Sequence, residues 1–417
     1  MSNQIFIARQ DTLEQEILPA HWLAQYKLFG EESYTFQAKG IWKKLCMSSA
    51  AANDRDIHAE ALEEMLTTFS AEHTGKWMLL VYGMDAAALE GLATMAAIAE
   101  SGTAMGAVAG NALLMHAIAN SETAMQRIAN SQTAMQRVAN NTTAMDAICR
   151  SRIARDAVQA SPYYNSYIKE NDMAIAKLAV ALANLESAGY SAMTAVAASA
   201  TAMTAVAASS VARNAISASP YYDEKIKEND MAIAKLVVGF ANLESARYSG
   251  CAGMAADSTA MTAVAASSTA MTAVAASGVA LKAIAQAYKN TANMLQFLKA
   301  VNASDTLIKR IYSTLTNATA LFGATQLGAQ DGVADANSWA TTSAAPNAFL
   351  ACACGYYNSG GASVDVTYNG TAIAQNKTGT RQPGSVTSTN VNAITMAPST
   401  FTENGDGWLA VQKFTVK

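Results

Sequence analysis

The feature that most constrains this chain is a ten-residue repeat. Within the 417-residue sequence, the stretch from Gly91 to Ala160 divides into consecutive ten-residue units such as SETAMQRIAN and SQTAMQRVAN. The fifth residue of a unit is Met until Arg155 replaces it, and the eighth is Ile or Val. Self-similarity at a short fixed period is typical of proteins whose units bury their apolar faces against their neighbours. The repeat therefore favours a structural or binding role over a catalytic pocket.

The repeat predicts one very short helix per unit. In an unbroken helix, ten residues advance by about 1000°, so the Met and Ile stripe would slip by roughly 80° per unit. Coiled-coil periods do not match either, and Ala and Met are weak strand formers. Asn at the end of a unit predicts a left-handed C-cap, and the Ser or Asn that follows predicts an N-cap. We therefore expect an α-solenoid of stacked short helices with a core formed by Met105, Met115, Met125, Met135, Met145, Ile118, Ile128 and Val138.

A longer duplication is superimposed on the short repeat. The segment that begins with SPYY at Ser161 recurs at Ser219, an offset of 219 − 161 = 58 residues. Each copy contains the SPYY turn, a longer amphipathic helix near Asp172–Ser187 or Asp230–Ser245, and further ten-residue units. Duplication of such a spacer is suited to setting a length.

Composition divides the chain into four parts. Residues 1–84 carry clustered aromatics and mixed charge, which predicts a compact attachment domain. The solenoid occupies 85–287, and a helical connector, broken near Asn302–Asp305, occupies 288–328. From 329 to 417, short alternating runs and the turn signal Asn369-Gly370 predict an antiparallel β-sandwich. The expected strands lie at Ala348–Cys354, Ser363–Tyr368, Gly370–Gln375, Val386–Met396 and Trp408–Lys417.

Charge argues against several classes of partner. The net charge is −4 and only 14% of residues are charged, against about 25% in typical globular proteins. Since no basic patch is present, nucleic-acid binding is not expected. Ala188–Ala212 and Ser258–Leu281 carry no charge, but their frequent Ser and Thr argue against a membrane span. Such faces predict a dry contact with the next repeat or with another subunit. The cysteines are expected to be small core residues in a reducing compartment.

No catalytic or metal-binding arrangement is found in the sequence, so we expect no enzyme activity, cofactor or metal. The four histidines (His21, His58, His73 and His116) lack ligand spacing. Asp365, Glu403 and Asp406 are expected to be surface carboxylates, with Ca²⁺ binding at Glu403–Asp406 as the alternative.

Three Tyr pairs are the aromatic candidates. Tyr163-Tyr164 and Tyr221-Tyr222 recur with the duplication and are expected to be structural. The candidate receptor-binding residues are Tyr356, Tyr357 and Asn358, because loop aromatics on a β-scaffold can stack on a sugar.

The order of these parts resembles that of virion structural proteins of tailed bacteriophages, such as tail fibres. The resemblance rests on the Ser-x-Thr-Ala-Met units between Gly91 and Ala285 and on the sparsely charged β-segment after Ala329. It implies a non-enzymatic appendage protein that is assembled in the bacterial host cytoplasm, resides in the virion and contacts other virion proteins. By the same analogy we expect a homo-oligomer, first of all a trimer, with residues 1–84 attached to the particle and the β-domain outward.

Two other functions stay open at this point. One is a carbohydrate-binding adhesin whose activity lies in the β-domain and whose ligand is a host-surface glycan. The other is an enzyme such as a polysaccharide depolymerase, which the absence of a catalytic arrangement disfavours.

Overall fold

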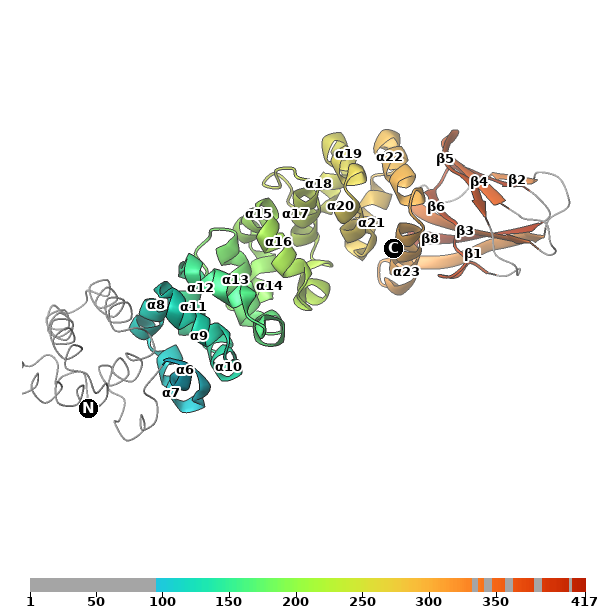
Figure 1. The fold of residues 1–417 in the computed structure, drawn as a ribbon. Helices are drawn as coiled ribbons and strands as arrows, with labels where there is room; N and C mark the ends of the chain where they lie inside the picture. The colour runs from blue at the N-terminus through green and yellow to red at the C-terminus, as the bar shows by residue number, and fades with distance from the viewer. Residues whose placement is uncertain (1–94, 332–336, 341–346, 357–362, 379–384, 405–406) are drawn as a thin grey trace, which may run out of the picture. The chain divides into compact units, whose positions relative to one another are not determined.

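The computed structural model describes residues 95–331, 337–340, 347–356, 363–378, 385–404 and 407–417 (Figure 1). The predicted attachment domain, 1–84, lies outside these residues. The chain divides into two compact units. The first runs to Met193 and includes Ala218–Pro220, and the second consists of Thr194–Ser217 and Tyr221–Lys417. Helices form the earlier part of the described chain and antiparallel sheets the last part, which confirms the predicted fold class.

Each ten-residue repeat of the first unit forms one short helix, as predicted. The N-caps are confirmed as well: Ser121, Ser131, Asn141 and Ser151 each accept a hydrogen bond from the backbone amide three residues later. The helices are α6 (Met95–Glu100), α7 (Gly102–Gly110), α8 (Ala112–Asn120), α9 (Glu122–Ala129), α10 (Gln132–Ala139), α11 (Thr142–Arg150) and α12 (Arg152–Ala160).

The predicted left-handed C-caps are wrong. Asn130 has φ −91° and ψ 0°, and Asn140 has φ −90° and ψ 5°. The bend comes instead from the N-cap residue, which hydrogen-bonds to both helices. The Ser131 amide donates to the Ile128 carbonyl of the preceding helix at 3.1 Å, and the Ser131 carbonyl accepts from the Met135 amide of the following helix. One extended residue between two helices is therefore enough to make the bend, and no positive φ is needed.

Each helix packs on the helix three places later in the chain. In the first unit these pairs are α6 with α9, α7 with α10, α8 with α11, and α9 with α12. Consecutive helices are sharply bent relative to one another, by 97° between α7 and α8. Three repeats therefore form one superhelical turn.

The duplicated segment replaces repeats with different elements. Its SPYY turn leads into a π-helix, η4 (Tyr164–Lys169) in the first copy and η5 (Tyr222–Ile226) in the second. The helices that follow, α13 (Asp172–Leu182) and α17 (Asp230–Phe240), are shorter than predicted. They are also buried on all sides over most of their length rather than amphipathic.

An asparagine ends each of these longer helices. Asn184 has φ 60° and Asn242 has φ 56°, both in the left-handed region. The amide of Leu185 then bonds the Val180 carbonyl and that of Asn184 bonds the Ala181 carbonyl, which is the Schellman pattern of a helix C-terminus. This local termination stops the helix before Ser187, where the apolar spacing alone predicted its end.

Stacking by three continues in the second unit. There α15 packs on α17, α17 on α20, α18 on α21, α19 on α22, and α20 on α23. Its ten-residue units form α14 (Met193–Ala198), α15 (Ala200–Ala208), α16 (Ser210–Ser217), α18 (Cys251–Ala256), α19 (Ser258–Ala266), α20 (Ser268–Ala275) and α21 (Gly278–Gln286).

The predicted connector consists of α22 (Thr291–Asn302) and α23 (Asp305–Asn317), with the break where it was expected. Strand β1, however, begins at Phe322, inside the range 288–328 that was predicted to be helical. Phe322 pairs with Val416 near the chain end. That pairing with a distant strand holds these residues in an extended conformation, and the local sequence does not reveal such a partner.

The β-domain contains two four-stranded antiparallel sheets, ordered β1-β8-β3-β6 and β2-β7-β4-β5. Phe349, Val366, Phe401 and Trp408 are buried in the core that the sheets share. At the β4–β5 turn, Asn369 and Gly370 have φ 49° and 77°, as a two-residue hairpin turn requires. The strands are β1 (Phe322–Asp331), β2 (Asn337–Ala340), β3 (Ala348–Tyr356), β4 (Ser363–Tyr368), β5 (Thr371–Thr378), β6 (Ala393–Met396), β7 (Ser399–Asn404) and β8 (Gly407–Val416).

Helix α22 is joined to the β-domain by a buried amide. The side chain of Asn302 donates to the Ile394 carbonyl at 2.7 Å and accepts from the Ile394 amide at 3.1 Å, so it pairs with β6 as a neighbouring strand would. Tyr312 of α23 donates to the Val386 carbonyl at 2.6 Å. One hydrophobic core runs from Ile233 to Phe414, so α22, α23 and the sheets form one body.

Candidate functional site

The predicted solenoid core is enclosed by the stacked helices. All eight core residues named from the sequence have no exposed surface: Met105, Met115, Met125, Met135, Met145, Ile118, Ile128 and Val138. The Met at position five and the Ile or Val at position eight lie on one face of each helix because they are three residues apart. Alanines around them let neighbouring helices approach closely.

A ladder of serine hydroxyls joins successive superhelical turns. Ser131 Oγ donates to the Ala99 carbonyl at 2.8 Å while it also accepts from the Ala134 amide at 3.2 Å. Two further serines make the same contact 32 residues back, Ser151 with Ala119 and Ser161 with Ala129, both at 2.5 Å. Each of these serines therefore satisfies a carbonyl at the C-terminus of one helix, and Ser131 and Ser151 also cap the helix that follows them.

Arginine replaces methionine where the regular repeats stop. The guanidinium of Arg155 donates to the Cys149 carbonyl at 2.5 Å. In the second unit, the guanidinium of Arg213 donates to the Ala207 carbonyl and lies 5.7 Å from the centre of the Phe240 ring. The two arginines occupy equivalent positions, since 213 − 155 = 58. An arginine at position five thus caps the preceding helix instead of entering the core.

A fully buried lysine lies at the centre of the first duplicated segment. Lys177 in α13 has no exposed surface. Its ammonium group donates to Asp146 Oδ1 at 2.6 Å and to the carbonyls of Ser187 and Ala188 at 3.2 and 3.3 Å. All three ammonium protons thereby find acceptors, and the lysine fixes the loop after α13 to both α13 and α11.

The equivalent lysine of the second copy lacks the carboxylate. Lys235 donates to Thr204 Oγ1 at 2.9 Å and to the carbonyls of Ser245 and Ala246 at 3.0 and 3.2 Å. Thr204 takes the place of Asp146, since 204 − 146 = 58. Burial lowers the pKa of Lys235 below its ordinary value of 10.5, because a charged ammonium is costly to desolvate.

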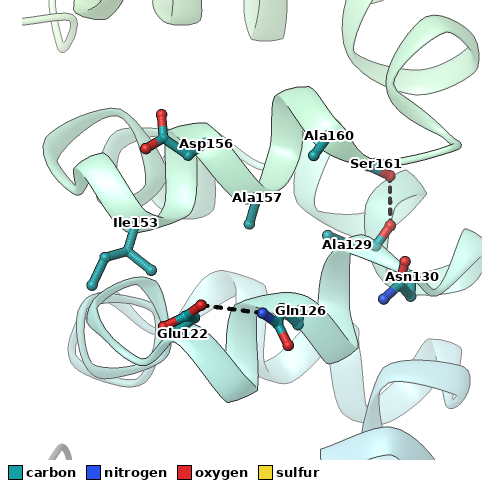
Figure 2. Close-up of a pocket in the computed structure, with 9 residues that line it drawn as sticks. All are labelled: Glu122, Gln126, Ala129, Asn130, Ile153, Asp156, Ala157, Ala160 and Ser161. Atoms are coloured by element: carbon teal, nitrogen blue, oxygen red, sulfur yellow. Dashed lines mark hydrogen bonds between the residues drawn. The ribbon is translucent and has the colours of Figure 1, made fainter.

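A groove lies between α9 and α12 in the first unit (Figure 2). It encloses about 370 Å³. Ala157 and Ala160 of α12 and Ala129 at the end of α9 form its apolar part, and Glu122, Gln126 and Asn130 form a polar rim. Ile153 stands at one end of the groove with 42% of its surface exposed.

The candidate receptor-binding residues are only partly described. Tyr356 ends β3 and is half-buried, while Tyr357 and Asn358 lie outside the described residues. Asp365 of β4 accepts from the Asn376 amide at 2.6 Å. The side chains of Glu403 and Asp406 also lie outside the described part, so the alternative Ca²⁺ site is not described.

The tyrosines of the SPYY segments lie half-buried at the starts of η4 and η5. Tyr163 packs 6.4 Å from Tyr167, whose hydroxyl accepts from Gln132 at 2.7 Å. Burial, together with the nearby carboxylate of Asp223, raises the pKa of Tyr222 to about 12. Tyr163 and Tyr164 pack against the core of the first unit, and Tyr222 packs against the core of the second.

Thiols and imidazoles of the described residues show no reactive arrangement. Cys149, Cys251, Cys352 and Cys354 are buried, and burial raises the pKa of Cys149 to about 12. His116 bonds Asn120 of the same helix at 3.2 Å. Over the described ranges, no group of three or more His, Cys, Asp and Glu side chains could hold a metal ion.

Sequence reasoning missed the buried lysines and the second bond of the serines. Each lysine interrupts an apolar run, MAIAKL, that is identical in both copies, and that interruption was the available signal. The serine bonds reach a residue in the preceding superhelical turn, and the local sequence does not reveal such a distant partner.

The chain matches no known protein-family model and no curated protein. In the part of the chain that the structure describes, no single helix is long and apolar enough to cross a membrane. Two sharply bent pairs, α7 with α8 and α20 with α21, reach such length and composition only when taken together.

Proposed function

We propose that this chain is a non-enzymatic structural component of a phage virion, a tail fibre or another appendage, in which the repeats act as a spacer. The observation that carries the proposal is the serine ladder. The contact between Ser131 and Ala99 recurs unchanged at Ser151 and Ser161. Three added repeats can therefore add one superhelical turn without any new kind of contact, so the number of repeats sets the length.

The other parts of the proposal follow the resemblance in domain order. The β-domain is the terminal recognition or attachment domain, and residues 1–84 attach to the particle. The protein is assembled in the bacterial host cytoplasm, resides in the virion, and associates with further copies of itself and with other virion proteins. The stack of short helices supports a role as a spacer. The hydroxyls of Ser131, Ser151 and Ser161 hold successive superhelical turns together.

The spacer role is tested by inserting a second copy of Ser121–Arg150 after Arg150. Packed helices lie about 8–10 Å apart, so one extra superhelical turn should increase the maximum dimension of the isolated protein by about 8–10 Å. Small-angle X-ray scattering measures this dimension. The control is a Gly/Ser insert of equal length at the same site. An unchanged maximum dimension, or the same change with the control insert, would contradict the spacer role.

Residence in the virion is tested on isolated particles. Antibodies against the β-domain should label an appendage in negative-stain images, at a constant distance from the particle wall. Particles that lack the chain by mass spectrometry would exclude a virion component.

The alternative is a carbohydrate-binding adhesin, favoured by the half-buried Tyr356 at the end of β3. The test is glycan-array binding by the full chain and by Tyr356→Ala. A fragment beginning at Ala329 is unsuitable, because it lacks α22, α23 and the part of β1 from Phe322 to Gly328. These elements belong to the same core as the sheets. Binding that is lost in the variant would favour the adhesin.

A further inference from the structure

Arg137 of α10 shows where the arginine of a regular repeat lies. Helix α10 packs on α7, three places earlier in the chain. A Cβ atom placed on Gly102 of α7 would lie 3.2 Å from Arg137 Nη2 and 3.6 Å from its Nε. The same Cβ would lie 3.8 Å from the methyl group of Thr133. The guanidinium at position seven of one repeat therefore covers position two of the repeat on which it packs.

The α9–α12 face has the same arrangement without the arginine. Helix α12 packs on α9, and its residue at position seven is Ala157. Position two of α9, which the guanidinium would cover, is Glu122, and position three of α12 is Ile153. These three residues line the groove of about 370 Å³ (Figure 2). The groove thus lies where the α7–α10 face holds an arginine side chain.

The charge of the groove complements a cation. Glu122 Oε1 accepts from the neutral Gln126 side chain at 3.3 Å, and within the described part of the chain Glu122 forms no ion pair. Asp156 also lines the groove, but it pairs with Arg152 at 3.6 Å. Figure 2 shows the Asp156 carboxylate on the side of α12 that faces away from α9. Glu122 is therefore the carboxylate that is placed to receive a cation.

We propose that this groove binds an arginine side chain of a partner protein. The guanidinium lies at Glu122, as that of Arg137 lies at Gly102, and its methylene groups lie over Ala157 and Ala160. A planar guanidinium matches a carboxylate through paired hydrogen bonds, and its aliphatic stem packs on apolar surface. The site depends only on the α9–α12 face, so it is independent of the proposed virion and spacer roles.

The probe for this site is Nα-acetyl-arginine amide, titrated into the full chain and followed by ligand-observed NMR. Nα-acetyl-citrulline amide, which has nearly the same shape and no charge, is the matched probe. Glu122→Gln removes the charge of the groove at almost constant shape. Glu100→Gln, at the exposed end of α6, is the matched control for loss of a surface carboxylate.

We expect the arginine probe to bind more tightly than the citrulline probe. Glu122→Gln should raise the dissociation constant of the arginine probe about fivefold or more, the upper range for an exposed ion pair. Glu100→Gln should leave that constant unchanged. Absence of binding, or equal binding by the parent chain and Glu122→Gln, would overturn the site. Equally tight binding of Nα-acetyl-lysine amide would overturn the assignment to arginine, because it would show a site for any cation.

A further variant gives the groove an arginine of its own. Ala157→Arg places at position seven the residue that α9 and α10 carry as Arg127 and Arg137, so the fold should persist. The new side chain should abolish binding of the arginine probe and raise the melting temperature of the first unit, and adding Glu122→Gln should cancel that rise. Undiminished probe binding by Ala157→Arg, or a rise in melting temperature that persists without Glu122, would contradict the proposal.

Discussion

Lys177 donates to Asp146 at 2.6 Å, and this ion pair links α13 to the helix one superhelical turn before it. The lysine is completely buried and the aspartate side chain is 21% exposed. Removing one partner of a buried pair leaves an uncompensated charge, which costs about 3–5 kcal/mol.

Asp146→Asn should therefore destabilise the first unit by several kcal/mol in urea unfolding, within the range of about 3–5 kcal/mol for broken buried pairs. The control is Asp156→Asn, which removes the exposed partner of Arg152, and an exposed pair contributes about 0–1 kcal/mol. If the two variants unfolded at the same urea concentration, Lys177 would not depend on its carboxylate.

In the second copy, the equivalent lysine has no carboxylate partner, so its burial predicts a pH dependence of stability. Since burial lowers the pKa of Lys235, the unfolded state binds more protons than the folded state between the folded pKa and 10.5. The free energy of unfolding should then rise with pH across that window. The free energy of unfolding is measured as a function of pH for the parent chain and for Lys235→Met. The difference between the two curves isolates the contribution of Lys235.

A new partner for Lys235 provides the complementary test. Thr204→Asp supplies the carboxylate that Asp146 provides in the first copy, so it should raise the pKa of Lys235 and remove the alkaline rise in stability. An unchanged pH profile in Thr204→Asp would show that the ammonium group is not sensitive to a charge at position 204.

The serine ladder predicts a larger effect than an ordinary helix cap. Ser131→Ala removes the N-cap bond, worth about 1 kcal/mol. It also leaves the Ala99 carbonyl without its donor, at a cost of about 1–3 kcal/mol for a buried acceptor. A combined loss of about 2–4 kcal/mol is expected in chemical denaturation. Thr133→Ala on the same helix should change stability by under about 0.5 kcal/mol, and a loss as large there would remove the special role of Ser131.

The buried stripe is tested by adjacent residues of α9. Met125 has no exposed surface and Gln126 is exposed. Met125→Asp buries an unpaired charge and should destabilise the array by several kcal/mol, in the upper range for point mutants of about 4–5 kcal/mol. Gln126→Asp should have little effect, and equal melting temperatures would show that the stripe is not the core.

Close backbone approach in the second unit is tested at Gly239. An added Cβ would collide with the carbonyl oxygen of Ala207 and lie 3.0 Å from its Cα, both on the backbone of α15. Gly239→Ala should therefore destabilise the protein by about 1–3 kcal/mol, as overpacking does. Gly106→Ala meets nothing within 4 Å and should stabilise α7 by up to about 1 kcal/mol. Equal effects of the two variants would exclude a tight α15–α17 contact.

What the sequence could predict was local. Ser121 precedes an apolar helix turn, and Met125 and Ile128 are three residues apart, so the cap and the buried face of α9 follow from neighbours in the chain. The hairpin turn at Asn369-Gly370 is local for the same reason.

The remaining features depend on partners far away in the chain. Nothing near Ser131 indicates that its hydroxyl reaches Ala99, so the closure of three helices into one superhelical turn was not predicted. Asn130 ends its helix without the left-handed conformation because the following N-cap makes the bend. Strand β1 starts at Phe322 because β8 returns to pair with it.

The central claim is that the ten-residue unit is the structural period of the solenoid, and two deletions test it most directly. Removing Ser131–Asn140 takes out one whole repeat and brings Asn141, itself an N-cap, directly after Asn130. Removing Ser131–Arg137 takes out fewer residues but breaks the period. In calorimetry of the full chain, the transition of the first unit should shift to a slightly lower melting temperature in the first variant and be lost in the second, while the transition of the second unit remains in both. Equal melting of the two variants, or better folding of the shorter deletion, would contradict a solenoid built on this period.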